Sequence, residues 1–286
     1  ARARRIVETL ALEHPSRNGI FPERLARAAE FLQAEFRSLG YDIRLQDFTA
    51  RGARYANILA ELPGTKHTSA IILGAHYDTV PGTPGADDNA SGVAGVLELA
   101  RLMRRMNPAH TILFAAFANE EPPFFHSPYM GSRHHAKQLR RSGDGVLLMF
   151  ALEMLGYAHD GVRQIYPFPG MRRLGRYPEK GNFIAVVGNL GTRKLTRIVR
   201  EAMREGCRIG VESLSAPGFL PPLFLSDHAS YWKCGFPAVM VTDTAFLRNP
   251  HYHLPSDTPQ TLNYEFLAEV VAGVLAAVTR IDRLDG

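Results

Sequence analysis

Residues that commonly bind metal ions follow several apolar runs of the sequence. The first run, residues 70–75, leads into His76 and Asp78, and a proline- and glycine-rich loop then leads to Asp87 and Asp88. A short apolar run of this kind predicts a buried strand. The loop can bring Asp87 back to the strand end, where an imidazole and a carboxylate together suit a divalent metal. We expect His76 or Asp78 to hold the metal and the other to steady the site.

A second cluster follows the apolar run at residues 110–118, which also predicts an interior strand. This run is followed by Glu120 and Glu121. Two adjacent carboxylates at the end of a buried strand repel each other, which raises the pKa of one of them unless a cation compensates. With a metal present, one glutamate can be a ligand and the other a general base. A solvated acidic turn is the ordinary alternative for an isolated pair of this kind.

Two further segments repeat this pattern. Glu153 comes directly after the apolar run 146–152, where an unpaired buried carboxylate would be costly. The loop that follows the run 238–242 contains His253 and, four residues later, Asp257. A histidine and an aspartate at this spacing suit one metal ligand and the carboxylate that orients it.

A separate motif, Ser226-Asp227-His228, precedes a short helical segment. Ser226 or Asp227 can cap that helix. The alternative is a hydrogen-bonded Asp227–His228 pair that supports a metal site, and the sequence leaves both interpretations open.

The candidate ligands lie at the ends of predicted strands or in the loops just after them. In an open α/β sheet, ligands bind outside the carboxyl ends of the strands. Nitrogen and oxygen donors without cysteine favour zinc, with manganese or cobalt left open. Three carboxylates and two imidazoles are too many for one tetrahedral ion, and they suit two ions about 3.5 to 4 Å apart that share a carboxylate. The candidate ligands are His76, Asp87, Glu121, Glu153 and His253.

Apolar periodicity predicts the elements that position these residues. The expected strands are 41–48, at an edge of the sheet, and 55–62, 70–75, 110–118, 146–152, 183–188 and 238–242. The expected helices are 22–39, 192–208 and 262–281, with another that begins near Ala90. Residues 159–181 show no usable period and predict surface loops. Because no linker divides the chain, we expect a single domain over residues 1–286.

Composition limits the possible functions. The chain has 286 residues, a formal charge of +5 and scattered arginine pairs without clustered aromatic residues, so we expect no nucleic-acid partner. No run of about 18 apolar residues occurs, so we also expect no membrane span. The two cysteines, Cys207 and Cys234, are expected to be free thiols, although one bridge between them stays open. The sequence leaves the compartment and the oligomeric state unassigned.

Six motifs together resemble the M28 family of zinc peptidases, which includes bacterial secreted leucyl aminopeptidases and is related to glutaminyl cyclases and glutamate carboxypeptidases. The resemblance extends from Tyr55 to the last helix, and the motifs occur in the order found in the family. It implies an α/β fold with a mixed, mostly parallel central sheet of about eight strands, flanked by helices, and a co-catalytic pair of zinc ions. The motifs are GAHYDTV, GADDNASGV, NEE, LEMLGY, SDHASYW and HYHLPSDT.

The resemblance also implies a role for each residue of the site. His76 and Glu153 would bind one zinc ion, Glu121 and His253 the other, and Asp87 would bridge the two ions. Glu120 would be the general base that takes a proton from the metal-activated water, and Asp78 would hold the His76 ring. Tyr252 resembles a tyrosine that stabilises the oxyanion in some members, whereas others place theirs where this chain has Leu223.

These observations predict a zinc-dependent exopeptidase that acts on peptides, with aminopeptidase activity as the main hypothesis. A carboxypeptidase of the same family is an alternative because the metal core is shared. A glutaminyl-peptide cyclase is another, although cyclases of this kind place tryptophan where this chain has Tyr252. An inactive binding domain is disfavoured because all five ligand types and Glu120 are present.

Overall fold

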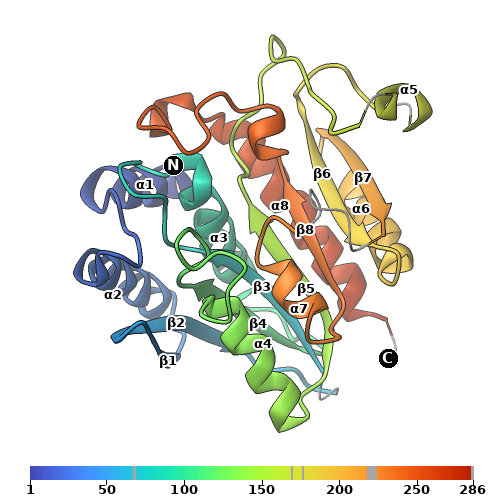
Figure 1. The fold of residues 1–286 in the computed structure, drawn as a ribbon. Helices are drawn as coiled ribbons and strands as arrows, with labels where there is room; N and C mark the ends of the chain where they lie inside the picture. Colours follow the sequence, from blue (N-terminus) through green and yellow to red (C-terminus); the bar gives the residue numbers. More distant parts are fainter. Residues whose placement is uncertain (67–68, 169, 176, 218–223, 285–286) are drawn as a thin grey trace.

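Apolar runs form the strands of one eight-stranded sheet in the computed structural model, which describes residues 1–66, 69–168, 170–175, 177–217 and 224–284 (Figure 1). Most of the central strands are apolar along their whole length because helices cover both faces of the sheet. In chain order the strands are β1 (Ile43–Ala50), β2 (Ala53–Leu62), β3 (Ala70–His76), β4 (Thr111–Phe117), β5 (Val146–Glu153), β6 (Phe183–Asn189), β7 (Gly210–Ala216) and β8 (Ala238–Thr242).

The order of the strands places the predicted ligand segments side by side. It is β1-β2-β4-β3-β5-β8-β6-β7, and β4, β3, β5 and β8 run parallel to one another. At one edge β1 and β2 form an antiparallel hairpin next to β4. At the other edge β6 is antiparallel to β8, and β7 is parallel to β6. The predicted fold class, a mixed and mostly parallel sheet flanked by helices, is therefore confirmed.

The helices form a layer on each face of the sheet. Helix α3 packs on β3, β4 and β5, α6 packs on β6 and β7, and α8 packs against α6 and α3. Helices α4 and α7 pack against each other and lie in front of the sheet in Figure 1. The helices are α1 (Arg2–Glu8), α2 (Pro22–Ser38), α3 (Gly92–Met103), α4 (Gly131–Ser142), α5 (Met171–Gly175), α6 (Arg193–Gly206), α7 (His228–Trp232) and α8 (Tyr264–Asp282).

Side chains of each strand alternate between two buried hydrophobic clusters. On β3, Ile71 and Leu73 belong to the larger cluster under α3 and α8, whereas Ile72 points into the smaller cluster under α4 and α7. Burial on both faces makes the strand rigid at its carboxyl end, where His76 lies.

Seven strands and the three long helices lie where periodicity predicts them, and β1 is an edge strand as expected. Strand β7 and helix α4 were not predicted. Helix α4 buries only small or polar residues, such as Gly131, Ser132, His135 and Ala136, so it has no apolar stripe. Residues 159–181, predicted as surface loops, contain the short helix α5 and a bridge between Arg163 and Lys180.

Two expectations from composition can be compared with the structure. Cys207 and Cys234 are both free cysteines. Within the described residues, no helix combines the length and the apolar composition needed to cross a membrane.

Candidate metal centre

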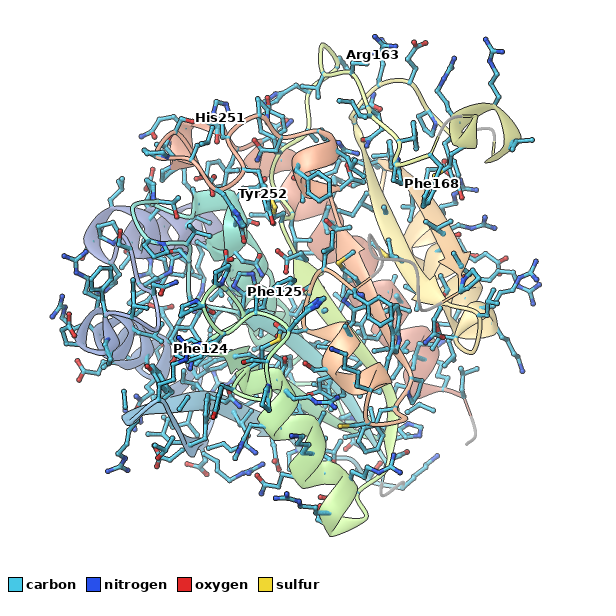
Figure 2. All side chains as sticks on the ribbon, in the orientation of Figure 1. Phe124, Phe125, Arg163, Phe168, His251 and Tyr252 are labelled. Carbon is cyan, nitrogen blue, oxygen red and sulfur yellow. The ribbon has the colours of Figure 1, made fainter. Side chains whose placement is uncertain are left out.

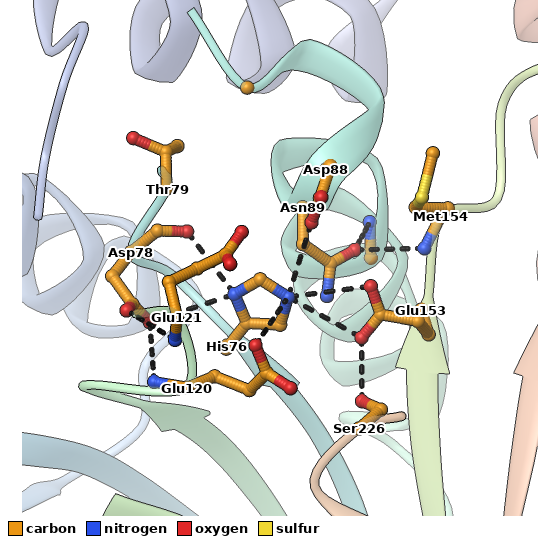
Figure 3. A network of polar contacts seen from close by, with 12 residues as sticks. His76, Asp78, Thr79, Asp88, Asn89, Glu120, Glu121, Glu153, Met154 and Ser226 are labelled. Atoms are coloured by element: carbon orange, nitrogen blue, oxygen red, sulfur yellow. Dashed lines mark hydrogen bonds and ion pairs between the residues drawn. The ribbon is translucent and has the colours of Figure 1, made fainter. Parts of the chain in front are cut away.

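Three neighbouring strand ends bring a histidine and three glutamates together (Figure 3). Strand β3 ends at His76 and β5 ends at Glu153, while Glu120 and Glu121 follow the end of β4. The three strands are parallel, so their carboxyl ends lie at the same edge of the sheet. The loop after β8 adds His253, which lies within ion-pair distance of Glu121.

Two groups of donor atoms share one carboxylate, that of Asp88. His76 Nε2 is 3.4 Å from Asp88 Oδ1 and 3.4 Å from either carboxylate oxygen of Glu153. His253 Nε2 is 3.1 Å from Asp88 Oδ2 and 3.4 Å from Glu121 Oε1. One oxygen of Asp88 therefore faces each histidine, and the donor atoms within each group lie no more than 4.8 Å apart.

The spacing of these donors fits zinc. Zinc binds imidazole nitrogen and carboxylate oxygen at about 2.0 to 2.1 Å in a tetrahedron, which places neighbouring donors about 3.3 to 3.5 Å apart. The separations from His76 Nε2 to Asp88 and to Glu153 are within this range, and those from His253 Nε2 are 3.1 Å to Asp88 and 3.4 Å to Glu121. One group contains His76, Asp88 and Glu153 and the other contains Asp88, Glu121 and His253, and each can hold one ion.

The structure places Asp88, and not the predicted Asp87, at the shared position. The carboxylate of Asp87 accepts hydrogen bonds from the main-chain N–H of Gly156 at 2.9 Å and from Asn249 Nδ2 at 2.8 Å. The two oxygens of Asp88, by contrast, face His76 and His253. The expectation for Asp87 is therefore corrected.

The electrostatics of the centre favour cations. Burial raises the pKa of Glu121 to about 8, with a further contribution from the charge of Asp88. Burial likewise raises the pKa of Glu120 well above its ordinary value. Burial alone would lower the pKa of His76, but the charges of Glu153 and Glu120 raise it. Four carboxylates share this small volume, and two divalent cations would supply the four positive charges that balance them.

Glu120 belongs to neither of these two groups, although it also places a donor atom within 4.8 Å of donor atoms of His76 and Glu121. Its Oε2 is 3.9 Å from His76 Nε2, and its Oε1 is buried without a hydrogen-bond partner among the described residues. The carboxylate of Asp78 accepts hydrogen bonds from the main-chain N–H groups of Glu120 and Glu121, both at 3.0 Å. Asp78 thus holds the two glutamates in place. It meets the His76 ring through its main-chain oxygen, 3.1 Å from Nδ1, whereas its carboxylate is 3.6 Å away.

Tyr252 is stacked on the imidazole of His253, with the ring centroids 3.7 Å apart. Burial raises its pKa, and the charge of Asp88 adds to the effect, so the hydroxyl keeps its proton and can donate it to a hydrogen bond. Figure 2 shows Tyr252 in the upper middle of the molecule. The alternative position for this function, Leu223, lies outside the described residues.

A pocket opens next to the centre, and its wall includes Glu153 and Tyr252. It extends over the apolar face of β6 and β8, where Val187 and Met240 form its floor, under the segment that contains α5. The pocket is mainly apolar, and its described lining includes no lysine or arginine.

Three supporting residues were missed or misassigned from the sequence. Ser226 does not cap α7 but donates a hydrogen bond of 2.6 Å to Glu153 Oε2. Asp257 accepts hydrogen bonds from the main-chain N–H groups of Asp87 and Asp88 and does not orient a histidine. Arg17 is completely buried and donates to four main-chain carbonyl groups at 3.0 Å or less. An isolated arginine in a loop gives no sequence signal for such a role.

Residues 57–278 match the profile of Peptidase family M28. The match covers most of the chain, which therefore belongs to this peptidase family and is a hydrolase. The resemblance inferred from the six motifs is confirmed.

Sequence relatives extend this result. The Escherichia coli (strain K12) protein YfbL, itself uncharacterized, is 46% identical over 262 residues, which cover 88% of this chain and 79% of YfbL. A probable leucine aminopeptidase of Trichophyton verrucosum is 28% identical over 242 residues, covering 79% of this chain and 57% of the relative. The chain thus spans little more than half the length of that aminopeptidase.

Solved structures share the fold. LapB from Legionella pneumophila has a TM-score of 0.80 at 20% identity, covering 99% of this chain and 72% of LapB. BSAP, a zinc aminopeptidase from Bacillus subtilis, has a TM-score of 0.74 at 16% identity, covering 97% of this chain and 94% of BSAP. A glutaminyl cyclase from Fimbriiglobus ruber has a TM-score of 0.67 at 22% identity, covering 98% of this chain and 94% of the cyclase.

Proposed function

We propose that this chain is a zinc-dependent aminopeptidase that removes N-terminal residues from peptides, with Glu120 as the general base. The observation that carries the proposal is the pair of donor groups that share Asp88, next to a glutamate whose Oε1 is free of hydrogen bonds among the described residues. His76 and Glu153 would hold one zinc ion, Glu121 and His253 would hold the other, and Asp88 would join them.

The zinc ions, when bound, would polarise the scissile carbonyl and lower the pKa of the attacking water. Glu120 takes a proton from that water and then passes it to the leaving amine. The Asp78 carboxylate keeps Glu120 in position by accepting a hydrogen bond from the main-chain N–H of Glu120. Tyr252 donates a hydrogen bond to the oxyanion that develops on the substrate carbonyl.

The charge of the pocket favours an aminopeptidase over a carboxypeptidase. A carboxypeptidase needs a cationic group to hold the free carboxylate of its substrate, but the described lining of the pocket contains no lysine or arginine. The carboxylates in its lining, Glu153 and Glu212, instead suit the positive charge of a free α-amino group. The apolar floor formed by Val187 and Met240 suits the side chain of an apolar N-terminal residue.

The test uses two peptides that end in a free carboxylate, one beginning with leucine and one with glutamine. After incubation with zinc-loaded protein, mass spectrometry should show a ladder shortened from the amino end. N-acetylated versions of both peptides are the matched controls and should stay intact. Shortening from the carboxyl end would contradict the proposal, and loss of ammonia from the glutamine peptide without shortening would assign a cyclase.

A further inference from the structure

The turn that presents Asp88 to the metal centre is held on one side by a buried arginine. Arg17 Nη1 donates to the carbonyl oxygen of Pro84 at 2.7 Å, and Nη2 donates to that of Gly85 at 2.8 Å. Its Nε donates to the carbonyl oxygen of Tyr77 at 2.7 Å. Arg17 therefore ties together both ends of the loop that connects His76 to Asp88.

A buried aspartate holds the other side of the same turn. Asp257 Oδ1 accepts a hydrogen bond from the N–H of Asp87 at 2.9 Å, and Oδ2 accepts one from the N–H of Asp88 at 3.1 Å. The main-chain oxygen of Asp257 also accepts the N–H of Ala86 at 3.3 Å. Between them, Arg17 and Asp257 thus bind the main chain of Pro84, Gly85, Ala86, Asp87 and Asp88.

Both side chains lie in the same buried region. Arg17 is 0% exposed and Asp257 is 1% exposed. Burial lowers the pKa of Arg17 to about 10, and the charge of Asp257 opposes this shift more than any other carboxylate does.

The turn is closely packed, and its conformation at Gly85 is one that favours glycine. Gly85 has φ +61°, and a Cβ atom there would lie 2.5 Å from the carbonyl oxygen of Asp88. A carboxylate that serves two ions has to direct one oxygen to each of them, so small rotations of this turn would misdirect Asp88. The same type of support occurs once more in the centre, where Asp78 binds the N–H groups of Glu120 and Glu121.

We propose that Arg17 and Asp257 are a pair of positioning residues that aim the Asp88 carboxylate at His76 and His253 and thereby set the zinc affinity of the centre. The inference rests on the metal centre put forward under the proposed function. Loss of a residue that orients a metal ligand typically weakens metal binding 10- to 100-fold, and this is the expected effect of Arg17→Lys and of Asp257→Asn. Lysine keeps the charge but lacks the forked donors, and asparagine keeps the size but lacks one acceptor.

The experiment measures zinc dissociation constants of the full chain by competition with a chromogenic chelator, without any peptide. Because both residues act on one turn, the double variant should lose less affinity than the product of the two single losses. The control is Arg248→Lys. Arg248 is also buried and also donates to a main-chain carbonyl, that of Phe183 at 2.8 Å. It does not contact the turn, so the zinc affinity of the Arg248→Lys protein should equal that of the unmodified chain.

Far-UV circular dichroism checks that each variant is folded, and the nearly isosteric Asp257→Asn decides the question if Arg17→Lys does not fold. Unchanged zinc affinity in the folded variants would overturn the proposal, as would an equal loss in Arg248→Lys. If the unmodified chain binds zinc but cleaves no peptide, the proposed function fails while the positioning role is still decided by the zinc affinities. If the unmodified chain binds no zinc, both proposals are refuted.

Discussion

Replacing Glu120 with glutamine should abolish most of the turnover while leaving the fold and the metal centre in place. Glutamine has nearly the same size as glutamate. Oε1 of Glu120 has no hydrogen-bond partner among the described residues, and its main-chain N–H would still be bound by Asp78 at 3.0 Å. The substitution therefore removes the proton acceptor while keeping the hydrogen bond from the main-chain N–H to Asp78.

The size of the loss follows from what a general base contributes. A positioned base accelerates a reaction about 10²- to 10⁴-fold, which corresponds to about 2.7 to 5.4 kcal/mol at 1.36 kcal/mol for each factor of ten. Because Glu120 acts in the transition state, kcat and kcat/KM should fall together while KM changes little.

The assay is the steady-state hydrolysis of leucine p-nitroanilide, with the zinc content of each preparation measured by mass spectrometry. Glu61→Gln on β2 is the matched control, since this exposed glutamate forms an ion pair with Arg44 at 3.4 Å on the edge hairpin, and full activity is expected. A Glu120→Gln protein that binds zinc normally and loses less than a factor of ten in kcat would refute the assignment.

Three further predictions test the centre, its pocket and its buried charges. Asp88→Asn should weaken zinc binding at least tenfold, as loss of a shared ligand requires, whereas Asp87→Asn, which alters a hydrogen-bond acceptor of the turn but removes no ligand, should weaken it less; the reverse pattern in a chelator competition would contradict the placement of the two residues. Val187→Phe should fill the pocket and reduce kcat/KM for leucine substrates relative to alanine substrates, and an unchanged ratio would argue against the pocket as the site of the substrate side chain. Burial raises the pKa of Asp227 and of Asp257 to about 7, so the folded chain holds protons that the unfolded chain releases. The melting temperature of the chelator-treated protein should therefore fall as the pH rises from about 5 to about 8. A constant or rising melting temperature would show that these shifts do not control stability.

Much of the fold could be predicted because each central strand is a continuous apolar run in the sequence. A strand covered on both faces must be apolar throughout, so the runs before His76, Glu121 and Glu153 identify β3, β4 and β5 directly. Polar residues at the ends of such strands are costly unless they have a function, which is why these candidates could be found. Strand β7 and helix α4 were missed because their burial is partial or polar, so they lack an apolar period.

The sequence by itself determined which residue types reach the edge of the sheet, because strand ends and loop positions follow from the apolar pattern along the chain. Only the tertiary structure decided which of two neighbouring aspartates faces the histidines. That choice depends on main-chain torsion angles and on partners far away in the sequence, namely Gly156 and Asn249 for Asp87 and Asp257 for the turn itself. The direction of a side chain is set by the hydrogen bonds that the folded chain makes around it, and no local pattern in the sequence records those contacts.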